Sequence, residues 1–204
     1  MSTMSKKIAG ISLLLVLAVM LLPVNSFSQS KVVGDFRLRN VDGRSVSLKD
    51  YPDAKGFIVV FTCNHCPFAK LYPPRLNELN ARYAAKGVYL IAISSTDTVV
   101  YEGDSYANMV VKARDEHFNF PYLMDDMQVV ARNFGAQKTP HAYVIWKEHN
   151  NYVVKYNGAI DDNGAEPEQV KRRYVAQAVD DLLAGRQVAI PETKSIGCQI
   201  NIRK

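Results

Sequence analysis

A strongly apolar segment that runs directly into two cysteines constrains the fold of this chain more than any other feature. Residues 57–62 (Phe-Ile-Val-Val-Phe-Thr) are all apolar or β-branched, which is typical of a buried β-strand. Cys63 and Cys66 follow at once, so the sequence predicts a thiol pair at the carboxyl end of that strand, where the next helix begins. The amino terminus of a helix stabilises a thiolate, because it carries partial positive charge and unpaired N–H groups.

Two cysteines separated by two residues indicate thiol–disulfide chemistry when they lie beside a strand–helix–strand unit. In the reducing direction, the thiolate of Cys63 attacks a substrate disulfide, and Cys66 then displaces the bound partner. A structural disulfide and half of a zinc site are the alternatives. The zinc alternative is weakened because the chain has no second C-x-x-C and no pair of histidines spaced by three to five residues.

The first 28 residues have the pattern of a secretory signal peptide. Two lysines precede an uncharged segment, residues 8–24, and Ser26 and Ser28 stand at −3 and −1 of a candidate cleavage site. An uncleaved membrane anchor is the alternative, since the apolar segment is near the shortest length that spans a bilayer. We therefore predict a signal peptide at 1–28, one domain at 29–204, and export, with the periplasm as the expected location.

The charge and the cysteine count narrow the class of protein further. The formal net charge is +5 for the whole chain and +3 without the two lysines of the signal segment. A balance this small is typical of a solvated surface rather than of a nucleic-acid-binding surface. Three cysteines in an exported protein indicate an oxidising compartment, one disulfide pair and one cysteine left over.

The hydrophobic patterns after residue 30 predict one α/β domain. Asp42-Gly43 lies between two alternating segments and predicts a β-hairpin over residues 36–48. The apolar segments 57–62 and 88–93, joined by a helix at about 65–85 that its two consecutive prolines should kink or interrupt, predict a parallel βαβ unit. The remaining expected elements are helices at about 105–118, 125–134 and 168–183, a short strand at 121–124, and an antiparallel hairpin of strands at 141–146 and 152–156.

Five segments of the chain together resemble the thioredoxin-like redoxins, a group that includes relatives of alkyl hydroperoxide reductase and thiol-specific antioxidant as well as exported thiol–disulfide oxidoreductases. They are residues 61–67, 120–123, 135–141, 158–163 and 197–198. The resemblance extends over about residues 32–202. It implies an α/β, thioredoxin-like fold with an N-terminal β-hairpin and a central helical insert.

The resemblance also implies a catalytic disulfide between Cys63 and Cys66 and a cis peptide bond before Pro140. A cis bond costs least before proline, about 0.5–1 kcal/mol, although the sequence alone leaves an ordinary trans bond open. A cis bend would expose the backbone of Thr139 beside the cysteines, where it could hydrogen-bond an incoming peptide as a strand does.

The chain departs from the family pattern at two positions. Thioredoxins usually have an acidic residue six positions before the first cysteine; here that residue is Phe57, so the proton relay is unassigned. Peroxiredoxins have a P-x-x-x-T/S-x-x-C signature, and aligning its cysteine with Cys66 puts Cys63 in the place of the threonine. His65, between the two thiols, should favour a thiolate and make the disulfide more oxidising; a solvent-facing histidine with little effect is the alternative.

We therefore predict an exported thiol–disulfide oxidoreductase whose catalytic residues are Cys63 and Cys66, supported by His65, Thr139 and Pro140. Its expected partners are protein or small-molecule disulfides and thiols and an upstream dithiol donor. We expect no nucleic acid, contact with a membrane only through an uncleaved signal segment, and no cofactor or metal besides the redox-active disulfide.

Two other functions and the role of one cysteine stay open. A thiol peroxidase with antioxidant activity is the second candidate, and Cu(I) handling by Cys63, Cys66 and His141 is the third, because soft thiolates suit that ion. Cys198 follows the last predicted helix. A buried structural thiol is the favoured interpretation for it, and a third redox cysteine or an intermolecular disulfide are the alternatives.

Overall fold

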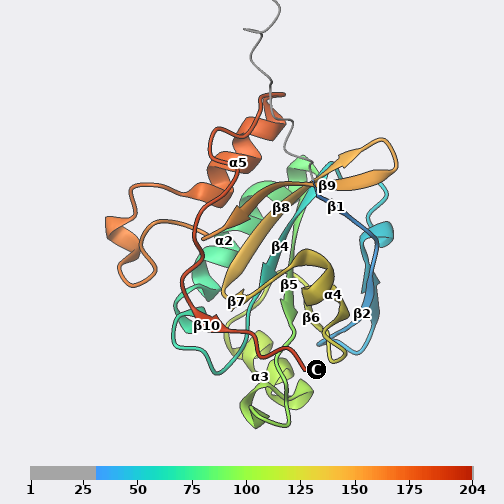
Figure 1. The fold of residues 1–204 in the computed structure, drawn as a ribbon, viewed down its shortest axis with the longest axis vertical. Helices are drawn as coiled ribbons and strands as arrows, with labels where there is room; N and C mark the ends of the chain where they lie inside the picture. Colours follow the sequence, from blue (N-terminus) through green and yellow to red (C-terminus); the bar gives the residue numbers. More distant parts are fainter. Residues whose placement is uncertain (1–30, 204) are drawn as a thin grey trace, which may run out of the picture.

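An eight-stranded mixed β-sheet runs through the computed structural model, which describes residues 31–203 (Figure 1). The strand order is β1-β9-β8-β4-β5-β6-β2-β3, and β7 and β10 form a separate two-stranded ladder. The strands are β1 (Val32–Val33), β2 (Arg37–Asn40), β3 (Ser45–Ser47), β4 (Gly56–Phe61), β5 (Val88–Ser94), β6 (Tyr122–Met124), β7 (Lys138–Thr139), β8 (His141–Glu148), β9 (Asn151–Gly158) and β10 (Cys198–Gln199).

Four α-helices and five 3-10 helices accompany the sheet within residues 31–203. The α-helices are α2 (Pro73–Tyr83), α3 (Tyr106–Asp115), α4 (Val129–Phe134) and α5 (Tyr174–Leu183), and the 3-10 helices are η1 (Leu48–Asp50), η2 (Ala69–Leu71), η3 (Ala84–Lys86), η4 (Glu102–Asp104) and η5 (Pro167–Gln169). None of the helices in this part of the chain has the length and apolar character needed to cross a bilayer. The predicted signal peptide, residues 1–28, lies outside the described residues.

The central strands confirm the predicted βαβ unit. All six residues of β4 are buried, as the continuous apolar segment indicates. This strand pairs in parallel with β5 and antiparallel with β8, and β8 returns through β9 as the predicted antiparallel hairpin. Near the start of the domain, β2 pairs antiparallel with β3 where the sequence predicts a hairpin around Asp42-Gly43.

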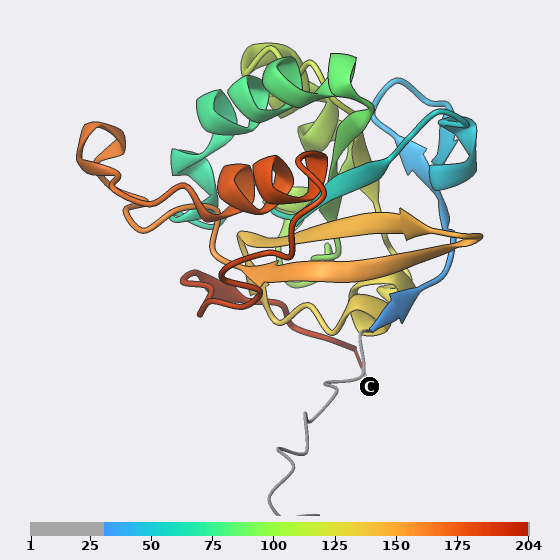
Figure 2. The same cartoon turned by 90° about the horizontal axis from the view of Figure 1, so that it is seen from above.

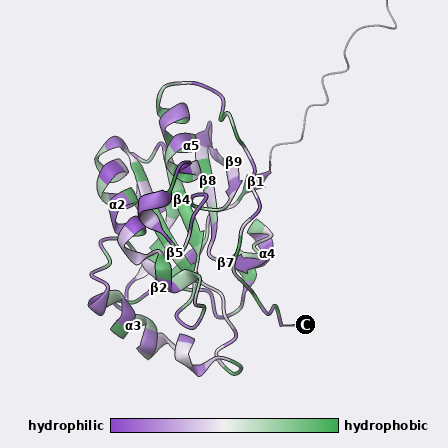
Figure 3. Cartoon of the chain, turned by 90° about the vertical axis from the view of Figure 1, so that its left-hand side faces the viewer, coloured by the Kyte–Doolittle hydropathy of each residue, from purple (hydrophilic) through white to green (hydrophobic). Residues whose placement is uncertain are grey.

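Two apolar layers cover the two faces of the sheet. Alternate residues of β4 point to opposite faces, so Ile58 and Val60 belong to one cluster and Phe57, Val59 and Phe61 to the other. The first cluster includes residues of α2, α3 and α5, and the second includes residues of α4 and η1. Figure 2 shows α2 and α5 on the same side of the sheet, and Figure 3 shows the hydrophobic residues concentrated on the central strands.

Three helices begin later than the sequence predicts: α4 at Val129 rather than near residue 125, and α2 and α5 by a wider margin. The helix after the cysteines, α2, starts at Pro73 rather than near residue 65, because two consecutive prolines fit the first helical positions, where N–H groups have no partner anyway. The cysteines therefore lie in a loop ahead of the short helix η2 rather than at the start of a long helix. The last helix, α5, starts at Tyr174 rather than near residue 168, after the single turn η5.

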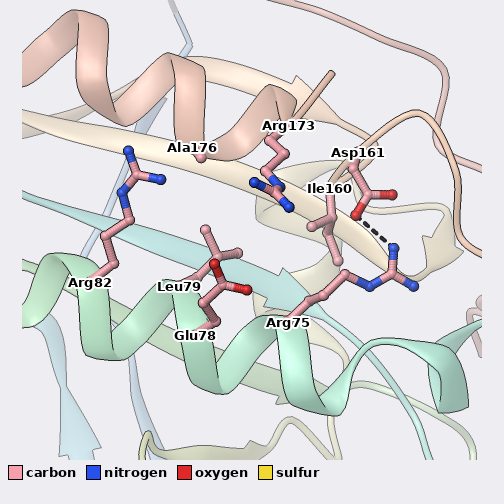
Figure 4. Close-up of a pocket in the computed structure, with 8 residues that line it drawn as sticks. All are labelled: Arg75, Glu78, Leu79, Arg82, Ile160, Asp161, Arg173 and Ala176. Carbon is pink, nitrogen blue, oxygen red and sulfur yellow. Dashed lines mark hydrogen bonds and ion pairs between the residues drawn. The ribbon is translucent and has the colours of Figure 1, made fainter. Parts of the chain in front are cut away.

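An ion pair fastens the segment after β9 to α2. Asp161 is buried and accepts hydrogen bonds from Arg75 at 2.7 Å and from the Tyr72 hydroxyl at 3.1 Å. Arg75 also donates to the carbonyl of Asn163 at 2.9 Å. Figure 4 shows this ion pair at the edge of a cavity between α2 and α5 that no cysteine lines. Asp161 is thus half of a largely buried ion pair.

Removal of the Asp161 carboxylate should destabilise the domain strongly. In Asp161→Ala, the largely buried guanidinium of Arg75 loses its counter-charge, and the free energy of unfolding should fall by about 3–5 kcal/mol. Urea unfolding measures this. The matched control is Asp115→Ala, which removes the exposed partner of Arg114 and should cost no more than about 1 kcal/mol. Equal losses in the two variants would show that the Asp161–Arg75 ion pair does not stabilise the domain more than an exposed pair does.

Candidate redox site

Both cysteines of the predicted pair meet Thr139. Cys63 follows β4 directly, and its sulfur lies 3.1 Å from the side-chain oxygen Oγ1 of Thr139. The thiol of Cys66 donates to the carbonyl oxygen of the same residue at 3.2 Å. The peptide bond between Thr139 and Pro140 is cis, as the family resemblance implies. Cys63, Cys66, Thr139 and Pro140 therefore lie together, and both cysteines are fully buried.

The fifth residue, His65, is held by a buried carboxylate. Its Nδ1 lies 2.5 Å from Oδ2 of Asp104, and its ring stacks on Tyr101 with the centroids 3.9 Å apart. The other oxygen of Asp104 accepts from the backbone N–H groups of Asn64 at 2.6 Å and of His65 at 3.0 Å. One carboxylate from η4 therefore fixes both the ring and the backbone of His65.

Sequence reasoning missed Asp104 and Tyr101. They lie about 40 positions after the cysteines, in a short acidic segment ahead of a helix, where a carboxylate is usually a cap. No spacing rule connects such a segment with the cysteine loop; the contact arises because β4 and β5 are neighbours and both end at the same edge of the sheet. Asn64 adds a second connection, as its side-chain oxygen accepts from the Tyr122 hydroxyl at 3.0 Å.

The two thiols differ in acidity. Burial raises the pKa of Cys63 to about 12, against the opposing hydrogen bond with Thr139. Burial also raises the pKa of Cys66, but hydrogen bonds from the Cys198 side chain and from the backbone N–H groups of Ala69 and Cys198 outweigh it, so this pKa lies below its ordinary value. Ala69 opens η2, so the N–H groups at a helix start act on the second cysteine. This order is the reverse of the sequence-based expectation, which puts the thiolate on Cys63.

The third cysteine lies at the same place. Cys198 in β10 is the antiparallel partner of Thr139 in β7, and its side chain packs against Cys63 and Cys66. It is partly exposed, whereas both other cysteines are fully buried. The favoured interpretation from sequence, a buried structural thiol, is therefore wrong as to burial.

One group of potential metal ligands occurs in residues 31–203. Ligand atoms of Cys63, His65 and Asp104 lie within 4.8 Å of one another, a donor set of the kind that zinc accepts. His141, which sequence reasoning added to a Cu(I) set, is not part of this group. It lies opposite Phe61 in the sheet, and burial lowers its pKa to about 4.

The comparisons with known proteins agree with this arrangement. The AhpC/TSA family model matches residues 30–162, so the chain belongs to this family. Among curated proteins, it is 27% identical over 118 residues to the thiol-disulfide oxidoreductase ResA of Bacillus cereus, covering 58% of this chain and 64% of that one. The chain thus spans a little less than two thirds of the length of this relative.

Several solved structures are similar to this chain in fold. An uncharacterized conserved protein from Geobacillus kaustophilus is 36% identical, with a TM-score of 0.78 over 88% of this chain and 94% of that one. A hypothetical protein from Sinorhizobium meliloti is 29% identical, with a TM-score of 0.77 over 86% and 95%. A putative thiol:disulfide interchange protein DsbE from Chlorobium tepidum, 20% identical with a TM-score of 0.52 over 65% and 85%, shows the thioredoxin-like fold.

The order of the thiol pKa values is testable in single-cysteine replacements. In reduced Cys63→Ser, Cys66 should ionise below its ordinary pKa, whereas in reduced Cys66→Ser the remaining Cys63 should need a pH approaching 12. The pH dependence of alkylation, read by peptide mass, measures both. Trypsin separates residues 56–70 from residues 195–203, so the signal of Cys198 is distinguished. Ionisation of Cys63 at the lower pH would restore the sequence-based order.

Asp104 should hold the cysteine loop in place. Asp104→Ala leaves two backbone N–H groups and the His65 ring without their acceptor, and the free energy of unfolding should fall by about 2–4 kcal/mol. Asp104→Asn keeps an oxygen for the backbone N–H groups and should lose clearly less. Urea unfolding of both variants measures the difference, and equal losses would show that the backbone contacts do not matter.

Proposed function

We propose that this protein is an exported thiol–disulfide oxidoreductase in which Cys63 and Cys66 form the redox-active disulfide. The observation that supports it best is the meeting of the two thiols at the cis bend, each within 3.2 Å of an atom of Thr139. Membership of the AhpC/TSA family and similarity to ResA, a named thiol-disulfide oxidoreductase, add to this support.

The proposed reaction is a two-step exchange. A protein thiolate attacks one sulfur of a substrate disulfide, which forms a mixed disulfide and releases the other substrate sulfur as a thiolate. The second protein cysteine then attacks the protein sulfur of the mixed disulfide. The products are a Cys63–Cys66 disulfide and a substrate dithiol that has taken up the two protons of the protein thiols. The lowered pKa of Cys66 makes it the more readily ionised thiol of the pair. An upstream dithiol donor would reduce the pair again.

The surroundings of the site support a protein disulfide as substrate. Tyr101, which stacks on His65, is 38% exposed, and the preceding Val99 and Val100 are 89% and 55% exposed. Phe68, two residues after Cys66, is 45% exposed. Exposed apolar side chains around a reactive centre are typical of a surface that binds another protein.

Export belongs to the same proposal. It rests on the signal-peptide pattern of residues 1–28 and on the chemistry of the site, because a stable catalytic disulfide suits an oxidising compartment. The periplasm is the location that we propose.

A thiol peroxidase is the second candidate, because the family includes peroxide reductases by name and because the pKa of Cys66, the cysteine that aligns with the peroxide-reacting position, is lowered. Rapid consumption of hydrogen peroxide by the reduced protein, abolished in Cys66→Ser and retained in Cys63→Ser, would favour this candidate over the oxidoreductase.

The proposed function predicts that both cysteines of the pair are needed. Reduction of insulin disulfides by dithiothreitol should be accelerated by the wild type, and the acceleration should fall strongly in Cys63→Ser and in Cys66→Ser, because neither variant can form the Cys63–Cys66 disulfide. Full activity in either variant would refute the assignment. The reduction potential of the wild type gives the direction: about −270 mV indicates a reductase and about −120 mV an oxidase.

A further inference from the structure

The C-terminal strand occupies the strand edge at which a substrate peptide is expected to bind. Thr139 and Lys138 of β7 pair antiparallel with Cys198 and Gln199 of β10. Figure 1 shows β10, near the red end of the colour scale, beside β7. The backbone of Thr139, which we expected to be open for an incoming peptide, is therefore already paired. The residue opposite it is Cys198.

The close approach of this strand is built into the chain. A Cβ atom on Gly197 would collide with the carbonyl group of Thr139, so the position next to Cys198 accepts only glycine while β10 is in place. On the other side of β10, Ile200 is buried, and its N–H donates to the carbonyl of Gln137 at 2.8 Å. The side chain of Gln128 donates to the carbonyl of Asn201 at 2.8 Å. The segment is thus fixed on both sides of Cys198.

Cys198 contacts the thiol of Cys66 directly. Its side chain packs against the cluster of Cys63, Cys66 and Ala69, and its side chain and backbone N–H both hydrogen-bond the Cys66 thiol. The carbonyl that accepts from Cys66 belongs to Thr139, the register partner of Cys198. Both cysteines of the pair are fully buried and Cys198 is only half-buried, so Cys198 is the thiol of this cluster that solvent reaches.

We propose that Cys198 is a third redox-active cysteine, which exchanges with Cys66 and so carries the disulfide between the buried pair and the protein surface. The proposal rests on the proposed function of Cys63 and Cys66. In the exchange, the Cys198 thiolate attacks Sγ of Cys66 in the Cys63–Cys66 disulfide. The Cys66–Cys198 bond forms as the Cys63–Cys66 bond breaks, and Cys63 leaves as a thiolate that takes up the proton lost by Cys198.

This step is an isomerisation of one disulfide, so it needs no oxidant or reductant beyond the one that made the Cys63–Cys66 bond. A dithiol partner then attacks the sulfur of the partly exposed Cys198, which releases Cys66 as a thiolate, while the pair stays covered by β10. In the reverse step, the Cys63 thiolate attacks Cys66 and releases Cys198.

Two matched variants test the proposal. Cys63→Ser leaves only Cys66 and Cys198, and Cys66→Ser leaves only Cys63 and Cys198. After oxidation with glutathione disulfide, trypsin should release residues 56–70 linked to residues 195–203 from Cys63→Ser, and this intramolecular link should form at least about tenfold faster than in Cys66→Ser, because reach decides the rate of exchange. Equal rates, or links found only in dimers, would overturn the proposal.

Gly197→Ala in the Cys63→Ser background keeps both thiols and disturbs only the seating of β10. The link should form several-fold more slowly there, and an unchanged rate would show that β10 does not present Cys198. The oxidised wild type provides a measurement without a cysteine replacement. In the fraction whose residues 56–70 are linked to residues 195–203, alkylation of the single free thiol should label Cys63. Absence of this linked fraction at every ratio of reduced to oxidised glutathione would refute the exchange.

The insulin assay on the wild type separates the two proposals. If the wild type reduces insulin but forms no Cys66–Cys198 link, the proposed role of Cys198 is refuted and the proposed function stands. A Cys66–Cys198 link in a protein that does not reduce insulin refutes the proposed function, and with it the exchange as a catalytic step.

Discussion

The contacts of Thr139 are the constraint on which the site depends. Its hydroxyl lies beside Cys63, its carbonyl accepts from Cys66, and its backbone pairs with Cys198. A single residue can do this because the cis bond to Pro140 turns the chain just before β8, the strand that is paired along its length with β4. The strand that delivers Cys63 and the bend that faces it therefore belong to one continuous ladder, and packing of the sheet fixes the geometry of the thiols.

A buried carboxylate does the corresponding work on the other side of the cysteines. Asp104 is fully buried, and two backbone N–H groups and the His65 ring contact its carboxylate. A buried carboxylate needs such partners, so movement of the cysteine loop away from Asp104 would cost a large amount of free energy. The same negative charge raises the pKa of Cys63. One group thus positions the loop and moves the thiolate towards Cys66.

Sequence reasoning succeeded where a pattern is local and failed where only tertiary contact decides. The continuous apolar segments predicted β4 and β5, and the family resemblance predicted the cis bond, because a short local segment of the sequence signals each feature. The two-residue strands β7 and β10 carry no periodic signal, since pairing with distant segments alone defines them. The order of the thiol pKa values was missed for the same reason. It depends on the start of η2 and on Cys198, more than 130 positions after Cys66.

The position of β10 resolves a conflict between protection and access. A thiolate with a lowered pKa is the form that peroxides and other oxidants attack, and full burial of Cys66 limits that damage. The same burial would keep a folded substrate away from the sulfur. A covering strand that itself carries a thiol removes the conflict, because an exchange inside the protein replaces direct contact with the substrate. Such a cover has to lie close to the backbone of Thr139 without a side chain in between, and Gly197 beside Cys198 meets that requirement.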